Sequence, residues 1–190
     1  LKPQSLIDGS RVVNFNISHH GNWVVFVASE NCLIGVDVVK VEKFVNQSIQ
    51  QMFRTFENQF SEHELSSMAT PHEEFYQLHM FYRYWCLKES YVKAVGVGLA
   101  LNLKSIEFHL PDEENRHIIS NGSEIINTKT SLYINNTLQR EWKFEESYLD
   151  ELHAVGIAYC ASNNYDYLDI EVDRFDKIEP EVLLGYSKEL

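Results

Sequence analysis

The sequence predicts an α+β fold that combines antiparallel strands with one dominant helix. Short apolar runs with polar residues between them recur near both ends of the chain, and turn-forming residues separate these runs. A single long helical pattern lies between the two groups, and the final strands follow one another as in a meander. The 190 residues, of which 44% are hydrophobic and 13% aromatic, allow one domain or two small ones with a sizeable core.

Three strands are predicted within the first forty residues. Residues 11–18 alternate apolar and polar side chains, as a half-buried strand does, and residues 19–22 (HHGN) supply a turn. Residues 23–29 form the returning strand. Residues 33–39 are a continuous apolar run that contains one acid, Asp37, and a run of this kind is typical of a central strand.

The middle of the chain is predicted to be helical. Residues 42–60 are amphipathic but irregular, which indicates a segment that is helical only in part. Ser61 and Glu64 have the spacing of a capping box, in which two side chains bond the free N–H groups at the start of a helix. A long helix is expected over residues 73–95. Gly96 is expected to be its C-cap, because glycine readily adopts the left-handed conformation that ends many helices.

The rest of the chain returns to strand patterns and ends in an acidic segment. A strand is expected at residues 104–110, followed by a polar loop at residues 111–123. Further strands of a meander are expected at residues 131–135, 141–145 and 153–159. Residues 161–190 are acidic and weakly patterned, so we expect them to form a peripheral tail.

Charge and composition exclude several classes of function. The formal net charge of −12 disfavours nucleic-acid binding, which needs a basic face. The longest apolar run, residues 94–101, is interrupted by glycines and is too short to cross a bilayer, and no signal segment opens the chain. The three cysteines (Cys32, Cys86 and Cys160) form no C-x-x-C pair, which indicates reduced thiols in a cytosolic protein. We therefore expect neither a nucleic-acid nor a membrane partner.

The long helix carries the first candidate site. Trp85, Glu89 and Lys93 are spaced by four, so they share one helix face, and Lys88 lies beside them. One interpretation is an ordinary salt-bridge ladder on a solvated face. Against this interpretation, Glu89 has unusually bulky neighbours in the sequence (Tyr82, Tyr84, Trp85, Leu87 and Tyr91). A partly buried carboxylate flanked by lysines favours a site that handles both a metal ion and an anion.

Asp37 is the second candidate, because an acid within an apolar strand costs free energy unless it is paired or binds a cation. It could instead be a strand-end aspartate that accepts hydrogen bonds. Magnesium takes oxygen ligands, commonly one or two carboxylates. Asp37 and Glu89 supply such a pair if the long helix packs over the strand. Ser18 and His19, at the end of the first strand, are a weaker signal, since a histidine there is more often structural.

Three short stretches are distinctive when they are taken together. Residues 15–19 (FNISH), 34–37 (IGVD) and 81–94 (FYRYWCLKESYVKA) contain a Ser-His, a Gly-Val-Asp and a Trp-x-x-Lys-Glu-Ser-x-x-Lys, in that order. This pattern resembles the 4′-phosphopantetheinyl transferase superfamily in its Sfp-type branch. Residues 96–99 and 141–146 also look like the family, and the resemblance covers about residues 1–160. It implies a pseudo-twofold fold of two similar α+β halves, with coenzyme A in the cleft between them.

The resemblance also implies an activity and the residues that carry it. The activity is the magnesium-dependent transfer of the 4′-phosphopantetheine arm of coenzyme A to a serine of an acyl or peptidyl carrier protein domain. Asp37 and Glu89 would hold the Mg²⁺ ion, and Glu89 and Lys93 would be the catalytic residues. The residues implied to contact coenzyme A are Lys2, Asn16, Ile17, Ser18, His19, Asp37, Glu89, Ser90, Tyr91, Val92 and Lys93.

The sequence departs from the family pattern in two respects. Val39 stands where many members carry a second acid, so water is expected to complete the magnesium shell. The N-terminal half of the family fold is also largely absent. We expect residues 1–30 to be the end of that half and strands leading to the cleft, residues 31–160 to be the C-terminal domain, and residues 161–190 to be the tail.

A chain that starts at Leu1 without a methionine is expected to be a fragment. It should then expose an apolar surface, bind coenzyme A weakly and self-associate, whereas the full-length enzyme should be a monomer. Three other functions stay open: a non-catalytic fragment that binds carrier proteins or coenzyme A, a short family member whose cleft forms at a homotrimer interface, and a generic magnesium phosphohydrolase.

Overall fold

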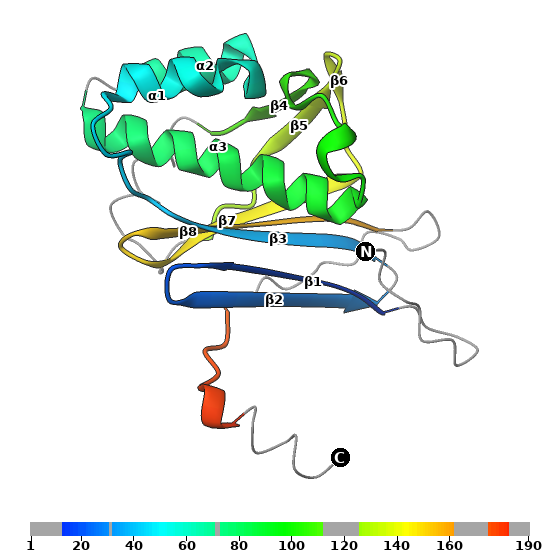
Figure 1. Ribbon diagram of the computed structural model, residues 1–190. Coiled ribbons are helices and arrows are strands. Elements are labelled where there is room, and N and C mark those ends of the chain that lie inside the picture. The colour runs from blue at the N-terminus through cyan, green and yellow to red at the C-terminus, as the bar shows by residue number, and fades with distance from the viewer. Residues whose placement is uncertain (1–12, 31, 71–72, 112–125, 162–174, 183–190) are drawn as a thin grey trace.

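The computed structural model describes residues 13–30, 32–70, 73–111, 126–161 and 175–182, which build a mixed α+β fold (Figure 1). The strands are β1 (Val13–His20), β2 (Trp23–Glu30), β3 (Cys32–Lys40), β4 (Ile106–His109), β5 (Ser131–Ile134), β6 (Thr137–Leu138), β7 (Trp142–Asp150) and β8 (His153–Ala161). The helices are α1 (Ile49–Phe56), α2 (Glu62–Ala69) and α3 (Glu74–Val95), with 3₁₀ turns η1 (Glu57–Gln59), η2 (Gly98–Ala100) and η3 (Leu103–Ser105). The predicted fold class is confirmed.

Within the described residues the strands form three sheets, and all their pairings are antiparallel. The central sheet has the order β3-β8-β7, β1 and β2 form a hairpin, and β4, β5 and β6 form a smaller sheet. α3 lies over one face of the central sheet, and α1 and α2 lie over α3 (Figure 1). The hairpin lies on the other side of the central sheet. No helix in the described part of the chain is both long and apolar enough to cross a membrane.

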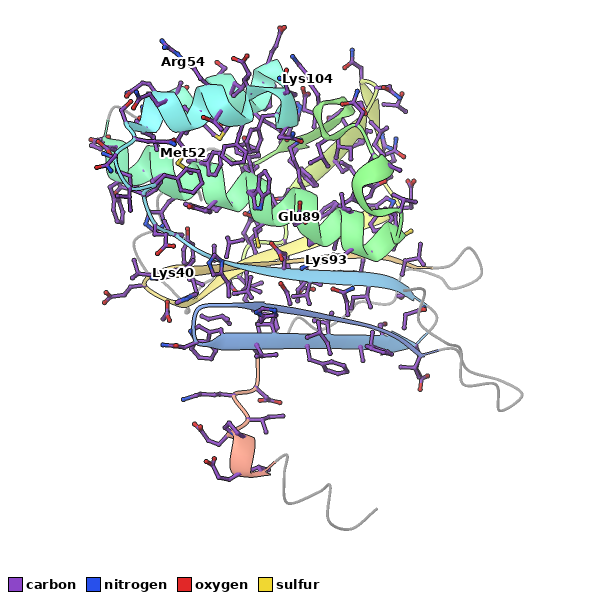
Figure 2. All side chains as sticks on the ribbon, viewed as in Figure 1. Lys40, Met52, Arg54, Glu89, Lys93 and Lys104 are labelled. Atoms are coloured by element: carbon purple, nitrogen blue, oxygen red, sulfur yellow. The ribbon has the colours of Figure 1, made fainter. Side chains whose placement is uncertain are left out.

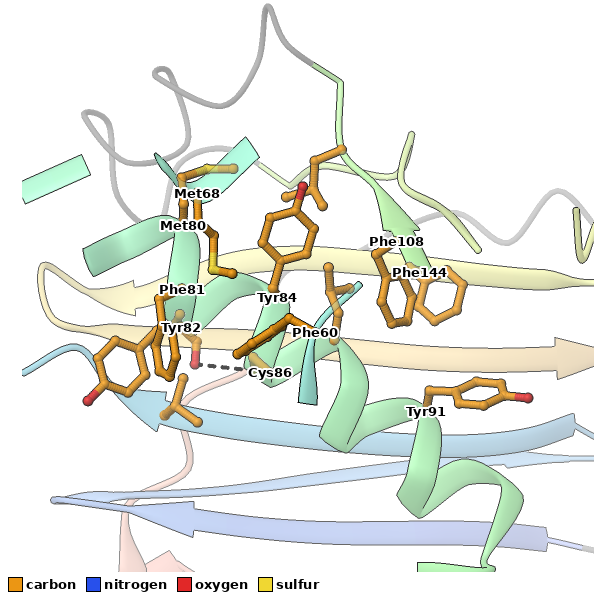
Figure 3. Close-up of a cluster of buried hydrophobic side chains, with 14 of the residues drawn as sticks. Phe60, Met68, Met80, Phe81, Tyr82, Tyr84, Cys86, Tyr91, Phe108 and Phe144 are labelled. Atoms are coloured by element: carbon orange, nitrogen blue, oxygen red, sulfur yellow. Dashed lines mark hydrogen bonds between the residues drawn. The ribbon is translucent and has the colours of Figure 1, made fainter. Parts of the chain in front are cut away.

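The main core surrounds α3 and is strongly aromatic (Figure 3). Phe60, Phe81, Tyr84 and Phe144 are almost completely buried there. Because the sheet covers one side of α3 and other helices cover another, the helix buries residues around most of its circumference and lacks a single apolar stripe. It ends at Gly96, whose φ of 69° is left-handed, so the predicted helix and its C-cap are confirmed.

β1 is joined to β3 by side chains. Asn16, Ser18 and His20 accept hydrogen bonds from the backbone N–H groups of Val36, Val38 and Lys40, at 3.2, 3.4 and 3.0 Å respectively. Each donor lies 20 residues after its acceptor, so the two strands run in the same direction. β3 is therefore an edge strand of its sheet rather than the predicted central strand. The polar residues of β1 satisfy N–H groups that an edge strand would otherwise leave unpaired.

Several predicted boundaries differ from those observed. The first turn is only Gly21 and Asn22, because the two histidines before it belong to β1. The strand expected at residues 104–110 starts only after η3, and β7 runs further than expected, to Asp150. The capping box at Ser61 and Glu64 is confirmed. A second box, formed by Ser48 and Gln51, starts α1 and was missed within the irregular segment 42–60.

The outer face of the hairpin is apolar and exposed. Phe15, Ile17, Val24 and Phe26 lie there with between 46% and 71% of their surfaces accessible. An exposed apolar surface was expected, and self-association through it stays a prediction. Of the expected tail, residues 175–182 are described, and Phe175 packs against a cluster of buried valines (Val25, Val36, Val38 and Val155). Lys2, the rest of the tail and most of the loop at residues 111–123 lie outside the described residues.

Candidate functional site

A close approach between α3 and β3 brings the two predicted acids together. At Gly35 an added Cβ would lie 2.2 Å from the backbone oxygen of Ser90 and 2.4 Å from the backbone nitrogen of Ala94. Both distances are far below van der Waals contact, so the helix packs on the strand at this depth only because residue 35 has no side chain. Two residues later, Asp37 emerges beneath the helix face that carries Glu89 and Lys93.

Asp37 is buried and accepts two strong hydrogen bonds. The Lys93 ammonium donates to Asp37 Oδ1 at 2.6 Å, and the Ser18 hydroxyl donates to the same oxygen at 2.7 Å. Lys93 also donates to Ser18 Oγ at 2.9 Å and to the backbone oxygen of Val36 at 3.3 Å. Ser18, Asp37 and Lys93 therefore form one cluster at the junction of β1, β3 and α3, which pairs the aspartate as its burial requires.

Glu89 lies beside this cluster without a salt bridge to any described residue. The alternative interpretation, a salt-bridge ladder, would pair Glu89 with Lys93, but Lys93 forms its ion pair with Asp37, so that interpretation is wrong. Burial raises the pKa of Glu89, the nearby Asp37 carboxylate raises it further, and Lys93 opposes both effects. The site therefore contains two neighbouring carboxylates and one ammonium group.

These residues line a cavity of about 720 Å³. Its charged end is formed by Ser18, Asp37, Glu89 and Lys93, and Ile17, His19 and His20 of β1 extend the wall. The other end is largely aromatic, with side chains from α3, α1 and the segment before α1 (Phe44, Phe56, Phe81, Tyr82 and Trp85). Figure 2 shows Glu89 and Lys93 on the part of α3 that faces β3. Glu42, which accepts a hydrogen bond from the Tyr82 hydroxyl through its backbone oxygen, also lines this end. The cavity thus offers a charged end and a largely aromatic end to one elongated ligand.

Lys88 is not part of this site, contrary to the prediction that Glu89 is flanked by lysines. Its side chain is fully buried and pairs with Glu64 of α2, with Lys88 Nζ 2.8 Å from Glu64 Oε2. Adjacent helix residues point about 100° apart, so Lys88 faces away from the cavity that Glu89 lines. Lys93 is the ammonium group that α3 contributes to the site.

The other predicted ligand-binding residues lie in different places. Asn16 bonds the Val36 N–H and is not among the cavity-lining residues. On α3, the Ser90 hydroxyl donates to the Leu87 carbonyl, the Tyr91 ring packs against Trp142, and Val92 is buried. These three side chains do not line the cavity, and their contact with coenzyme A stays a prediction. Lys2 lies outside the described residues.

The donor set fits a hard divalent cation. Asp37 and Glu89 provide carboxylate oxygens from two elements, β3 and α3, and both residues line the same cavity. The described residues hold no group of three or more potential ligands from histidine, cysteine, aspartate and glutamate. Two carboxylates are nonetheless sufficient for Mg²⁺, which usually keeps several waters and takes its other oxygens from a substrate phosphate. Val39, which stands at the position of the expected second acid, also lines the cavity and offers no oxygen ligand from its side chain.

The aromatic end of the cavity was not predicted. Phe44 and Phe56 come from the irregular segment 42–60, where the sequence pattern indicated only partial helix. That segment contains four phenylalanines (Phe44, Phe53, Phe56 and Phe60), a signal that could have suggested an aromatic wall. Of the bulky neighbours of Glu89 that the sequence indicated, Tyr82 and Trp85 line the cavity, whereas Phe81 was not among them. Tyr82 is further fixed because its hydroxyl donates to the Glu42 carbonyl at 2.6 Å.

Comparisons with known proteins identify the same part of the chain. Residues 33–160 match the family model described as the 4′-phosphopantetheinyl transferase superfamily. A Xenopus laevis L-aminoadipate-semialdehyde dehydrogenase-phosphopantetheinyl transferase is 37% identical over 145 residues, which are 76% of this chain and 46% of the relative. The Homo sapiens protein of the same name is 36% identical over 157 residues, covering 83% of this chain and 49% of the relative.

A bacterial relative matches a shorter region. A Bacillus subtilis 4′-phosphopantetheinyl transferase is 34% identical over 101 residues, covering 53% of this chain and 41% of the relative. The chain therefore spans about half the length of the curated relatives that it matches.

Proposed function

This chain belongs to the 4′-phosphopantetheinyl transferase superfamily, and from this premise we propose that it carries the metal-binding and catalytic part of such an enzyme. The proposed reaction moves the 4′-phosphopantetheine arm of coenzyme A to a serine of a carrier protein and converts the apo carrier to the holo form. We propose more specifically that the enzyme is a holo-[acyl-carrier-protein] synthase and that it depends on Mg²⁺. We also propose that the full-length enzyme is a monomer located in the cytosol.

The observation that carries the proposal is the meeting of Asp37, Glu89 and Lys93 at one end of a cavity whose other end is aromatic. Coenzyme A has the matching chemistry, because its phosphates are charged and its pantetheine arm is far less polar. Phosphate groups suit the end with an ammonium group and a site for a cation, and the arm suits the aromatic wall. Ser18 and His19 border the charged end, where the nucleotide of coenzyme A would lie.

The residues divide the work of the reaction. A carrier serine attacks the phosphorus that bears pantetheine, and adenosine 3′,5′-bisphosphate leaves with the electron pair of the broken P–O bond. Asp37 and Glu89 would hold Mg²⁺, which when bound offsets negative charge on the pyrophosphate. Lys93 supplies a fixed positive charge that favours the developing charge on the leaving group. Burial raises the pKa of Glu89, a direction that suits a general base for the serine proton and a gain of about 10²–10⁴-fold.

Asp37→Ala tests the proposal directly. It removes one carboxylate and should abolish magnesium-dependent binding of coenzyme A while the fold is retained, which calorimetry and circular dichroism would measure. Asp176→Ala is the matched control, because Asp176 is exposed and lies outside the cavity lining. Unchanged affinity in Asp37→Ala would remove Asp37 from the site. Binding of coenzyme A by the wild-type protein without transfer to any carrier would favour the non-catalytic alternative.

A further inference from the structure

A second charged cluster lies within the core, on the side of α3 away from the cavity. Lys88 and Glu64 are both fully buried, and Lys88 Nζ lies 2.8 Å from Glu64 Oε2. The same ammonium donates to the backbone oxygen of Leu103 at 2.8 Å and to that of Ile106. The three hydrogens of the ammonium group therefore have three acceptors, one on α2, one in η3 and one at the start of β4.

The carboxylate of Glu64 is equally well satisfied. It accepts from the Ser61 N–H at 2.8 Å as part of the capping box of α2, and from the Phe108 N–H at 2.9 Å. Burial raises the pKa of Glu64 and lowers that of Lys88, and the partner charge opposes the shift in each case. Bonded in this way, the pair joins α2, α3, η3 and β4 at one point.

A buried pair of this kind contributes little net stability, because desolvation of the two charges offsets most of their attraction. Its geometry is nevertheless demanding. The three acceptors of the Lys88 ammonium lie on three different elements, so a large rotation or shift of α3 would break at least one of the three contacts. Apolar side chains at the same two positions could fill the space over a wider range of helix orientations.

The rotation of α3 decides where Glu89 points. Glu89 follows Lys88 directly, and a step of one residue turns the helix by about 100°. Glu89 has no salt bridge with a described residue, whereas Lys93 and Asp37 are tied to each other. Contacts of its own therefore do little to hold the Glu89 carboxylate toward the cavity, and the orientation of the helix must do so.

We propose that Lys88 and Glu64 are positioning residues that fix the rotation of α3, so that the Glu89 carboxylate meets Asp37 and the reacting groups. This inference rests on the proposed transferase function. Neither residue touches the cavity, so their loss should affect the catalytic step and metal binding more than the affinity for coenzyme A. Lys93, Ser18 and the aromatic wall would still bind that substrate.

The test uses variants of the full protein that remove the pair without leaving a lone buried charge. Lys88→Met combined with Glu64→Gln is neutral, and the glutamine keeps an acceptor for the capping box. The matched control makes the same two changes at exposed positions, Lys104→Met with Glu62→Gln. Lys88→Arg is the rescue variant, because it keeps the charge. The folded fraction of each variant is measured first by circular dichroism and thermal unfolding.

Carrier labelling then separates kcat from the KM for coenzyme A. A displacement of Glu89 by about 1 Å should lower kcat by on the order of 10²-fold in the neutral double variant, with little change in KM. The control should match the wild type, and Lys88→Arg should recover part of kcat. A loss of kcat no larger than the loss of folded protein would show a merely structural pair and overturn the proposal.

A second measurement does not depend on turnover. The affinity for Mn²⁺ in the presence of coenzyme A, followed by the electron paramagnetic resonance of free Mn²⁺, should weaken in the neutral double variant and not in the control. If the wild type labels no carrier but binds Mn²⁺ with coenzyme A, the proposed activity fails and this comparison still decides the positioning role. Equal Mn²⁺ affinity in the double variant and the wild type overturns the positioning role of Lys88 and Glu64. A wild type that neither labels nor binds overturns both proposals.

Discussion

Gly35→Ala should separate the two carboxylates of the site. The added methyl group would lie 2.2 Å from the Ser90 carbonyl oxygen, whereas ordinary van der Waals contact begins at 3.4 Å. Both clashing groups, this oxygen and the Ala94 nitrogen, belong to the backbone of α3, so no flexible side chain can move aside. The helix must retreat from β3 by about 1 Å, and Glu89 and Lys93 must retreat with it.

Two effects of different size follow from that displacement. Overpacking of a well-packed contact costs about 1–3 kcal/mol, so the protein should remain folded but unfold at a lower denaturant concentration. A shift of about 1 Å between reacting groups can cost on the order of 10²-fold in rate. The loss of carrier labelling should therefore be much larger than the loss of folded protein.

The comparison is made with Gly156→Ala, which adds a methyl group in the neighbouring strand. Gly156 is the β8 partner of Asp37, and its added Cβ would have the Cys86 Sγ at 3.3 Å as its nearest neighbour and backbone atoms of Cys86 at 3.5 Å, which is ordinary contact. Labelling rate, magnesium-dependent binding of coenzyme A and urea unfolding are measured for both variants. If Gly35→Ala labels carriers as fast as Gly156→Ala, the close approach of α3 to β3 does not set the geometry of the site.

Three further outcomes are expected. Glu89→Gln keeps the shape of the side chain but removes the base and weakens the metal site, so turnover should fall much further than coenzyme A affinity. Carrier labelling at a near wild-type rate would contradict the role of Glu89 as general base and metal ligand. Lys93→Met should weaken binding and turnover together, since its charge serves the ground state and the transition state alike, whereas Lys104→Met at an exposed position should change neither. Burial lowers the pKa of His79 to about 4, below the 6.5 of an exposed histidine, so between these values the unfolded chain binds a proton that the folded one does not. The free energy of unfolding should therefore fall by up to about 3 kcal/mol as the pH drops from 6.5 to 4. Urea unfolding of the wild type and of His79→Gln across this pH range measures the effect, and the variant should lack this pH-dependent loss of stability.

Much of the fold could be predicted because its signals are local. The hairpin strands, the long helix and its C-cap at Gly96 follow from alternation, helical spacing and one glycine, all of which act over a few residues. Asp37 and Glu89 could be predicted as candidate site residues because an acid in an apolar strand and an acid among aromatic residues are both costly without a partner. Lys93 was a candidate because of its spacing on the same helix face and the family resemblance, and the roles of all three stay predictions. Such costs can be seen in the sequence even when the partner cannot.

What the sequence could not predict are the partners themselves. Lys93 pairs with Asp37, 56 residues earlier in the chain, and Lys88 pairs with Glu64 on another helix. These choices depend on how α3 is rotated against its neighbours, which local patterns do not fix. The side-chain bonds of β1 to β3 were missed for the same reason, since Ser18 acts there as an acceptor for a strand 20 residues away.

The run from Cys86 to Glu89 explains why the motif on α3 is so compact. Successive residues of a helix point about 100° apart, so four consecutive side chains contact four different parts of the structure. The Cys86 thiol donates to the Asp37 carbonyl at 3.0 Å, Leu87 enters the aromatic core, Lys88 binds Glu64, and Glu89 lines the cavity. A substitution at any of these positions must then fit one particular neighbour. The spacing of the motif in this chain therefore reflects the packing of α3 on all sides as much as the chemistry of the one face that is proposed to carry the reaction.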